Sequence, residues 1–483
     1  MKTRTLVVMT IISLIVSVKS FSNTIKVTTG TDSIPGSLRD AINNAQSGDI
    51  ITFDNSLTEI KLGEQIAIDK SITISGNPNL LIHINRQYIL YRIFEINGTD
   101  AITVNINNLT LKKTQSCYFT DTVSYDANGG IMLVNNTNST VNINSCNFTG
   151  YGTESGGGVI YFYNLNGQNG GAIAQYGGVL NISNCTFSYL YSSTMAYWGV
   201  GGAIYQALGE MNLINCTFYN NECGVNHNNN NGYNMGYGAA IHSQNSTISI
   251  TNCTFCNNVT FYSYTIPTYP FIVTLTTYVI SLYNSNLTIK NSILYNNDGN
   301  RDIIGSINSG GYNIFGQTTV TGSVSSDLFN CNPGFILNGG NVVLSNNTFW
   351  IPVCALENST GCAIDALPAG GNGAPQYDER GFKRFNSPDI GAYEYKGTNN
   401  TGLPALINVD LIKIYPDPAI DYIKIETQQQ VVINISNIHG QLVKTLTASG
   451  NTTNVDVSAL PSGVYIVEVK TKKGVVVEKF VKE

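Results

Sequence analysis

The tetrapeptide Asn-Cys-Thr-Phe occupies residues 184–187 and recurs at residues 215–218 and 252–255. Two looser copies stand at residues 145–148, Ser-Cys-Asn-Phe, and at residues 291–294, Asn-Ser-Ile-Leu. A motif that returns at intervals of roughly 30 to 40 residues is the signature of stacked structural repeats. The middle of the chain is therefore predicted to be a repeat array.

A second motif precedes each later copy at a fixed distance. It reads Gly-Gly-Ala-Ile at 170–173 and 201–204, Gly-Ala-Ala-Ile at 238–241 and Thr-Tyr-Val-Ile at 277–280. An asparagine follows three residues after the aromatic or leucine position in three units, at Asn221, Asn258 and Asn297. A fixed internal order with variable lengths between the units is typical of a solenoid.

Within a unit, the apolar residues follow the period of a strand. Leu180 and Ile182 alternate with polar neighbours, which predicts a half-buried strand. Asn184 then shifts the phase so that Cys185 and Phe187 also point inward, and asparagine tolerates the left-handed backbone that such a bend needs. A strand, a bend and a second strand describe one coil of a parallel β-helix, with coils about 4.8 Å apart.

The cysteines fall into two groups. Cys146, Cys185, Cys216 and Cys253 align on the repeat and are expected to form a column of buried thiols, in preference to disulfides or a metal site. Outside the column, Cys354 and Cys362 are close in sequence and are the predicted disulfide. A pair between Cys223 and Cys256 is a further alternative.

The N-terminal region carries two separate signals. Residues 1–20 combine Lys2 and Arg4 with an apolar run that is too short to span a membrane, which predicts a secretory signal peptide. Farther along, Ser37 and Asp40 predict a capping box at the start of a short helix that ends at Gly48. The apolar face of that helix suits it to cover the open end of a solenoid. No transmembrane segment is expected in the mature chain.

Composition excludes several classes of protein. Charged residues make up 12% of the 483 residues, against about 25% in average globular chains. So few charges argue against a disordered charged tail and against a coiled coil. A net charge of −6 gives no sign of a nucleic-acid partner.

Several motifs carry a resemblance to known families. Residues 35–54 resemble the entry segment of secreted right-handed parallel β-helix proteins, and the Gly-Gly-Ala-Ile and Phe-x-x-Asn pairs resemble the repeats of chlamydial polymorphic outer-membrane proteins. Residues 310–313 and 363–395 resemble the choice-of-anchor Q domain. The resemblance implies an all-β fold, a right-handed parallel β-helix of the pectate-lyase type over residues 21–396, but it implies no ligand.

The C-terminal region resembles a different family, the type A sorting domain of the Bacteroidetes type IX secretion system. The matching pieces include residues 415–419, Tyr-Pro-Asp-Pro-Ala, where Asp417 replaces the usual asparagine, and residues 463–467, Gly-Val-Tyr-Ile-Val. The resemblance implies a small β-sandwich over residues 407–483, joined by a linker at 397–406. It also implies export through the periplasm and the outer-membrane type IX machinery to the cell surface or beyond.

Catalytic candidates are few. A uronate lyase needs basic residues, and none stands between Lys113 and Lys290. A glycoside hydrolase needs two carboxylates roughly 5–10 Å apart. The weak candidates for such chemistry, in a polysaccharide hydrolase or lyase, are Glu210, Glu222, Asp298, Arg301 and Asp302.

Metal sites have still less support. His227 and His242 stand one coil apart but have no evident third ligand. No cofactor and no metal site is predicted, and Ca²⁺ stays open. Five charged residues near the end of the solenoid are expected to form a structural closing network: Asp378, Arg380, Arg384, Asp389 and Glu394.

Insertions between the repeats are rich in aromatic residues. They cover residues 152–169, 191–200, 222–237 and 259–276 and are expected to gather on one side of the solenoid. Aromatic faces among amides suit the recognition of neutral glycans or another surface polymer, although the rings could instead pack over the flank of the solenoid. The candidate ligand-binding residues are Tyr161, Tyr163, Tyr191, Tyr197, Trp198, Tyr233, Tyr237, Tyr262 and Tyr264.

These observations predict a non-catalytic, adhesin-like or glycan-binding surface protein. Two other functions stay open, a polysaccharide-degrading enzyme and a structural scaffold of the envelope. The enzyme would shorten its polymer, whereas the scaffold would neither bind nor shorten one.

Overall fold

The computed structural model describes most of the chain, with interruptions. The described residues are 22–77, 79–84, 92–112, 128–150, 169–194, 200–226, 237–263, 278–297, 302–335, 341–343, 350–352, 354–356, 360–399, 413–416, 418–426, 431–437, 442–448, 452–471 and 474–483. The predicted signal peptide at 1–20 and most of the predicted linker lie outside them.

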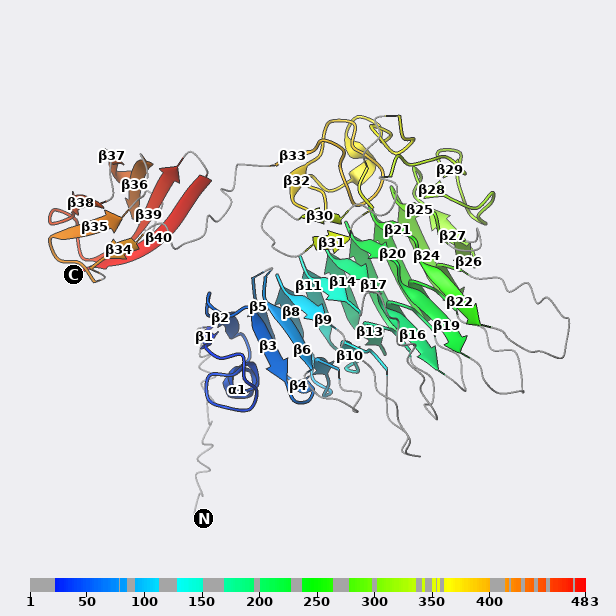
Figure 1. Cartoon of the computed structure of the whole chain (residues 1–483), viewed down its shortest axis with the longest axis horizontal. Coiled ribbons are helices and arrows are strands. Elements are labelled where there is room, and N and C mark those ends of the chain that lie inside the picture. Colours follow the sequence, from blue (N-terminus) through cyan, green and yellow to red (C-terminus); the bar gives the residue numbers. More distant parts are fainter. Residues whose placement is uncertain are drawn as a thin grey trace, which may run out of the picture. The chain divides into compact units, whose positions relative to one another are not determined.

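The N-terminal and central parts form a parallel β-helix, as the repeats predict. Its coils build a 16-stranded parallel sheet that bends into two faces. Face 1 consists of β4 (Ile66–Ile68), β7 (Phe94–Ile96), β10 (Met132–Val134), β13 (Ile173–Gln175), the first parts of β17 (Ile204–Ile214) and β20 (Ile241–Thr251), β23 (Ile280–Tyr283) and β26 (Ile303–Ile304). Face 2 consists of β1 (Thr24–Val27), β2 (Ile50–Phe53), β5 (Ile72–Ser75), β8 (Thr103–Asn107), β11 (Thr140–Asn144), β14 (Val179–Ser183), the second parts of β17 and β20, β24 (Asn286–Lys290) and β27 (Ile307–Ser309). Figure 1 shows these strands stacked side by side.

Two further parallel sheets complete the coils. Face 3 has ten strands: β3 (Glu59–Leu62), β6 (Leu81–Ile84), β9 (Thr110–Lys112), β12 (Asn147–Thr149), β15 (Thr186–Ser188), β18 (Thr217–Tyr219), β21 (Thr254–Cys256), β25 (Ile293–Tyr295), β28 (Ile314–Phe315) and β29 (Leu328–Phe329). Face 4 has three: β16 (Tyr191–Thr194), β19 (Glu222–Asn226) and β22 (Val259–Ser263). Face 4 uses residues that the sequence analysis assigned to the insertions, so the coil is longer than its recurring motif.

Asparagines in the left-handed region make the bends of the coil. Between faces 2 and 3, Asn184, Asn215 and Asn252 have φ values of 53°, 51° and 52°. The predicted bend is therefore confirmed. Asn220 and Asn257 make the bend between faces 3 and 4 in the same way, with φ values of 52° and 56°.

Glycines explain the Gly-Gly-Ala-Ile motif. Gly201 has a φ of 69°, which side-chain-bearing residues rarely adopt. A Cβ atom on Gly202 would lie 1.9 Å from the carbonyl oxygen of Ala239 in the next coil. Gly201 is therefore required for its backbone conformation, whereas Gly202 is required because the next coil packs closely against it.

Like residues stack inside the solenoid. Phe148, Phe187, Phe218 and Phe255 form a buried column whose successive ring centroids are 4.6–4.8 Å apart and nearly parallel. The aligned cysteines form the expected column of free, buried thiols. Burial raises the pKa of the Cys185 thiol well above its usual range, so these groups act as small apolar side chains.

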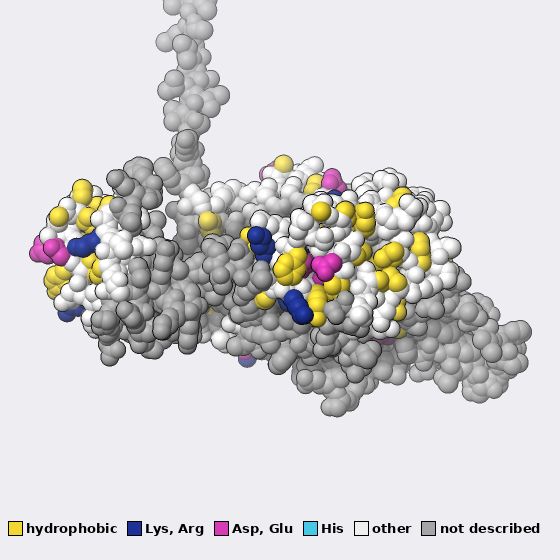
Figure 2. Space-filling view, turned by 90° about the horizontal axis from the view of Figure 1, so that it is seen from above, with side chains coloured by type: hydrophobic (Ala, Val, Ile, Leu, Met, Phe, Trp, Pro, Cys, Tyr) yellow, Lys and Arg dark blue, Asp and Glu magenta, His cyan; other side chains and the backbone are white. Residues whose placement is uncertain are grey.

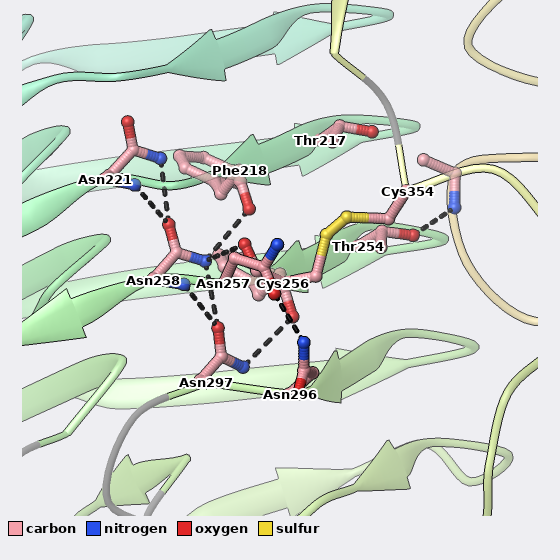
Figure 3. Close-up of a disulfide and its surroundings, with 12 residues drawn as sticks. Thr217, Phe218, Asn221, Thr254, Cys256, Asn257, Asn258, Asn296, Asn297 and Cys354 are labelled. Atoms are coloured by element: carbon pink, nitrogen blue, oxygen red, sulfur yellow. Dashed lines mark hydrogen bonds between the residues drawn. A yellow bond between two sulfur atoms is a disulfide. The ribbon is translucent and has the colours of Figure 1, made fainter. Parts of the chain in front are cut away.

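A third interior column is polar. The Asn221 side-chain amide donates to Asn258 Oδ1 over 2.9 Å, and the Asn258 amide donates to Asn297 Oδ1 over 3.1 Å. The same oxygens accept backbone N–H groups from Asn221 and Asn258 (Figure 3). The Phe-x-x-Asn pattern therefore marks an internal ladder that satisfies backbone groups at the second bend.

The predicted capping helix is present as α1 (Leu38–Asn44) and ends before Gly48. Ser37 Oγ accepts the backbone N–H of Asp40 over 3.2 Å, which confirms the N-cap. The second hydrogen bond of the predicted capping box is shifted by one residue. The Asp40 carboxylate accepts the backbone N–H of Gly36 rather than that of the N-cap residue, Ser37. Leu38, Ala41 and Ile42 are buried in the solenoid core.

The predicted Cys354–Cys362 disulfide is wrong. Cys354 is bonded to Cys256 of β21, and Cys362 is bonded to Cys331. The Cα atoms of these pairs are 6.6 Å and 6.2 Å apart, within disulfide reach. The alternative pair of Cys223 and Cys256 is also wrong, because Cys223 remains a buried thiol outside both disulfides.

Residues 360–396, called the closing segment below, follow the last coils and contain a short 3₁₀ helix (Gly371–Gly373). An antiparallel pair precedes the closing segment in sequence, β30 (Asn341–Val343) with β31 (Trp350–Pro352). Within the segment, β32 (Phe382–Lys383) pairs with β33 (Thr398–Asn399), which follows the segment in sequence.

The C-terminal residues form a separate compact unit of antiparallel strands. One sheet contains β34 (Lys413–Tyr415), β35 (Tyr422–Glu426) and β38 (Thr452–Asp456). The other contains β36 (Val431–Asn437), β37 (Leu442–Ala448), β39 (Gly463–Thr471) and β40 (Gly474–Lys482). Ile423, Ile433, Val467 and Phe480 belong to a buried core of its own.

Candidate binding surface

The insertions leave and re-enter the solenoid at one corner. They leave after face 4, where Tyr191 pairs with Glu222 and Glu222 pairs with Val259. They re-enter at Asn169, Val200 and Tyr237, which form parallel bridges with one another just before face 1. The bases of successive insertions therefore stack in register on the same side of the solenoid.

Four rings lie on the outer side of face 1 beside this corner: Tyr176, Tyr205, Tyr237 and His242, called the aromatic row below. Tyr205 and His242 are in register on β17 and β20, and their rings stack with centroids 5.8 Å apart. Tyr176 lies 5.6 Å from Tyr205, and Tyr237 lies 6.2 Å from His242. Tyr176 and Tyr237 are half-buried, so these two rings retain exposed surface.

Burial sets the protonation of the row. It lowers the pKa of His242 to about 4 and raises the pKa of Tyr205 to about 12. Both rings are therefore neutral at pH 7. The aromatic row is an uncharged surface rather than an acid, a base or an anion site.

The sequence analysis missed Tyr176 and Tyr205, because it took its candidate ligand-binding residues from the insertions between the repeats. The register supplies the signal that could have found them. Ala174, Tyr205 and His242 occupy one outward column, one residue after the inward isoleucine of the Gly-Gly-Ala-Ile motif.

The predicted ligand-binding residues are only partly placed. Tyr191 begins β16 and is half-buried, Tyr237 belongs to the aromatic row, and Tyr262 lies in β22. Six others lie outside the described residues: Tyr161, Tyr163, Tyr197, Trp198, Tyr233 and Tyr264. His227 lies outside them as well.

The structure places two of the candidate catalytic acids, Glu210 and Glu222, on different sheets of the coil. Glu210 is exposed on face 2, where it accepts a hydrogen bond from Asn212 over 2.9 Å. Glu222 is half-buried on face 4, and burial raises its pKa. The two carboxylates belong to different sheets of the coil, so they do not make the facing pair that glycoside hydrolysis needs.

Asp302 is buried and engaged in hydrogen bonds. Its carboxylate accepts the Gln317 backbone N–H over 3.0 Å, and its own N–H donates to Gln317 Oε1 over 2.7 Å. Burial raises the pKa of Asp302 to about 7. Asp298 and Arg301 lie outside the described residues, so Asp302 is the one member of the predicted charged cluster that the structure describes.

The predicted closing network forms and includes one more member, Glu379. Arg384 contacts Glu394 over 3.1 Å and also donates to Asn215 Oδ1 at the bend of the solenoid. Arg380 pairs with Asp378 over 2.5 Å. The network joins the closing segment to face 3.

The carboxylates of the closing network are already engaged. Asp389 accepts the backbone N–H groups of Asp365 and Tyr395. Glu394 accepts those of Phe385 and Asp389. Among the residues that the structure describes, no three His, Cys, Asp or Glu side chains are grouped so as to hold a metal ion.

Charge is sparse on the surface as well. On the face shown in Figure 2, charged side chains are scattered among uncharged ones. An open hollow of about 650 Å³ near the end of the solenoid is lined by uncharged residues of the β23–β24 and β26–β27 coils, including Leu282, Thr288 and Asn308. The described residues on this face and those that line this hollow therefore carry little charge.

Comparison with known proteins identifies one part of the chain. Residues 413–483 match the family described as the secretion system C-terminal sorting domain. No curated protein matches the chain. In the part that the structure describes, no helix is long and apolar enough to cross a membrane. The sorting domain marks the protein for type IX secretion, which makes it a secreted or cell-surface protein.

Proposed function

We propose that this protein is an adhesin-like surface protein whose β-helix binds a neutral glycan, or a similar neutral surface polymer, without cleaving it. The observation that carries the proposal is the aromatic row at the bases of the insertions. Tyrosine rings with an exposed face stack on the apolar faces of sugar rings. The aromatic insertions themselves supply the rest of the proposed surface.

Charge and placement favour binding over catalysis. The aromatic row is neutral at pH 7, because tyrosine is uncharged well below its pKa and burial lowers the pKa of His242 to about 4. Glu210 and Glu222 lie on different sheets, and Asp302 is buried and hydrogen-bonded. These features support retention of a neutral polymer better than acid–base cleavage.

Affinity electrophoresis of the full chain tests the proposal. The protein is run through gels that contain xylan, galactomannan, laminarin or polygalacturonate, and the polymer is then sized. We expect retardation by at least one neutral polymer, which stays intact. Retardation by polygalacturonate alone, or none by any polymer, would contradict neutral-glycan binding.

Variants locate the surface. Tyr176→Ala with Tyr237→Ala should weaken the retardation, as should Tyr197→Ala with Trp198→Ala in the insertion. Tyr422→Ala, an exposed tyrosine of the sorting domain, is the matched control and should not change it. Shortened polymer that disappears in Glu210→Gln or Glu222→Gln would instead support a polysaccharide-degrading enzyme.

A further inference from the structure

Face 2 carries an uninterrupted row of uncharged polar side chains on its outer side. The row follows the register of the strands through eight coils, so each member lies beside the next. Its members, called the polar row below, are Thr73, Asn105, Asn142, Asn181, Asn212, Ser249, Thr288 and Asn308. The coil spacing places one such group about every 4.8 Å.

The asparagines of the row hold one another in place. Asn142 donates to Asn105 Oδ1 over 2.8 Å, Asn181 donates to Asn142 Oδ1 over 2.8 Å, and Asn212 donates to Asn181 Oδ1 over 2.9 Å. Asn105 in turn donates to Thr73 Oγ1 over 3.1 Å. The amides are therefore ordered before any ligand arrives, which lowers the entropy lost on binding.

These hydrogen bonds use only half of the amide groups of Asn105, Asn142 and Asn181. A side-chain amide has two N–H donors and an oxygen with two lone pairs. Within the described residues, Asn105, Asn142 and Asn181 each spend one N–H and one lone pair on the row. Each of these three asparagines therefore retains one donor and one acceptor for a ligand, whereas Asn212 also donates to Glu210 Oε1.

The row is accessible along its length. Asn105, Asn142, Asn181 and Asn212 are half-buried by their neighbours, whereas Thr288 and Asn308 are exposed. Figure 1 shows the strands of face 2 side by side. The row ends in the open hollow described above, whose lining includes Thr288 and Asn308.

Face 3 shows how this solenoid uses such a row when it is covered. Thr186, Thr217 and Thr254 lie in register on its outer side and are buried beneath the closing segment. Glu379 accepts hydrogen bonds from Thr186 and Thr217, and the Ala392 N–H donates to Thr254 Oγ1 over 2.9 Å. The outward threonine column of face 3 thus binds a polypeptide segment that lies across the coils. The polar row of face 2 offers more unused hydrogen-bonding groups than this column does.

We infer that the polar row binds an extended neutral glycan chain that lies along the solenoid axis, with its hydroxyl groups on successive amides. This inference rests on the proposed function and names a second surface for it. A hydroxyl is both donor and acceptor, which matches the donor and acceptor that Asn105, Asn142 and Asn181 leave unused. The absence of charge in the row favours a neutral polymer over an acidic one.

A polypeptide fits the row less well. An extended peptide presents groups to one side at every second residue, about 6.6 Å apart, whereas the coils repeat at about 4.8 Å. A pyranose unit of an extended chain is close in length to one coil spacing. The coil spacing therefore favours an extended glycan over an extended polypeptide as the ligand of the polar row.

The test uses the full chain and the neutral polymer that gives the strongest retardation. Asn142→Ala with Asn181→Ala removes two amides, and the dissociation constant should rise about tenfold. Asn142→Thr with Asn181→Thr keeps a hydroxyl at each position, as Ser249 and Thr288 do naturally, and should retain most of the affinity. Asn55→Ala with Asn386→Ala, two exposed asparagines away from the row, is the matched control and should bind as the wild type does. Circular dichroism and melting temperature show that each variant is folded.

The outcomes separate this inference from the proposed function. If the wild type binds, and the double-alanine variant of the polar row is folded and binds equally well, the inference is overturned. The proposed function then stands on the aromatic row alone, provided that the Tyr176→Ala with Tyr237→Ala variant is weakened. If the wild type binds no neutral polymer, both fail. Equal loss in the threonine and alanine variants would also overturn the inference, because it assigns binding to hydrogen-bonding groups that threonine supplies.

Discussion

The hydroxyl of Thr186 donates a hydrogen bond to Glu379 Oε1 over 2.6 Å, although the two residues lie 193 positions apart. The other carboxylate oxygen of Glu379 accepts a hydrogen bond from Thr217 in the next coil. One buried acid therefore fastens the closing segment to two successive coils of face 3. Burial raises its pKa to about 8, so the group that holds the contact at neutral pH is mainly the protonated acid.

This raised pKa predicts that alkaline pH weakens the fold. The folded pKa of Glu379 lies above its unfolded value of 4.5. The stability tied to this acid is fully present below about pH 4.5 and is lost as the pH rises through about 8. A tenfold difference in the ionisation constant between the folded and unfolded chain corresponds to about 1.4 kcal/mol. Thermal melting between pH 5 and 9 should therefore show a falling melting temperature in the wild type.

Glu379→Gln is the matched variant for this prediction. Glutamine keeps the shape and cannot ionise, so we expect a smaller decrease of the melting temperature between pH 5 and 9. Asp302 and Asp389, whose pKa values burial raises to about 7, still contribute a decrease in the same direction. Parallel pH profiles for the wild type and Glu379→Gln would refute the assignment to Glu379.

The Cys256–Cys354 disulfide predicts a large loss of stability when it is removed. It closes a loop across a sequence separation of 98 residues, and loops of that length are worth about 3–5 kcal/mol in the unfolded chain. Cys256→Ala with Cys354→Ala should lower the free energy of unfolding by that amount in denaturant titrations.

Peptide mapping of the non-reduced protein checks the pairing directly. It should recover peptides that join Cys256 to Cys354 and Cys331 to Cys362. A peptide that joins Cys354 to Cys362 would contradict the structure. Cys223→Ala is the control, because Cys223 takes no part in either disulfide and its removal leaves both intact.

Much of the solenoid could be predicted from the sequence because its determinants are local and repeated. Asn184 marks a bend by its own backbone preference, and Leu180 and Ile182 mark an inward strand by their alternation. Phe187 recurs in the same place in each coil, so a column of rings followed. Stacking in register turns a one-dimensional repeat into a three-dimensional column.

What could not be predicted depends on contacts between unlike segments. Cys354 and Cys362 are close in sequence, but Cys354 is bonded to Cys256 in face 3 and Cys362 to Cys331, which follows the last strand of face 3. Face 4 has no shared motif, since Tyr191, Glu222 and Val259 occupy one column. Tyr205 is not among the candidates because it lies in the constant part of the repeat, where alternation along the strand places it outward.

The aligned thiols predict a pattern of chemical reactivity. Cys146, Cys185, Cys216 and Cys253 are buried and free, and burial raises the pKa of the Cys185 and Cys216 thiols. Because the thiolate is the reactive form, iodoacetamide should leave all four unmodified in the folded protein. Mass spectrometry should find them alkylated after denaturation in guanidinium. Rapid labelling of Cys185 in the folded state would contradict its place in the core.

The internal asparagine ladder predicts a difference between two chemically identical substitutions. Asn258 donates to the Phe218 carbonyl over 2.9 Å and accepts the Asn221 backbone N–H over 3.1 Å inside the core. Asn258→Ala leaves these groups buried without partners, so we expect a loss of about 2–4 kcal/mol in the free energy of unfolding.

Asn142→Ala is the comparison, because Asn142 belongs to the polar row and water can replace its partners. Its cost should stay below about 1 kcal/mol. Urea titrations of the two variants, followed by circular dichroism, measure the difference. Equal destabilisation by Asn258→Ala and Asn142→Ala would mean that Asn258 does not make buried hydrogen bonds inside the solenoid. The Phe-x-x-Asn pattern would then mark only a turn.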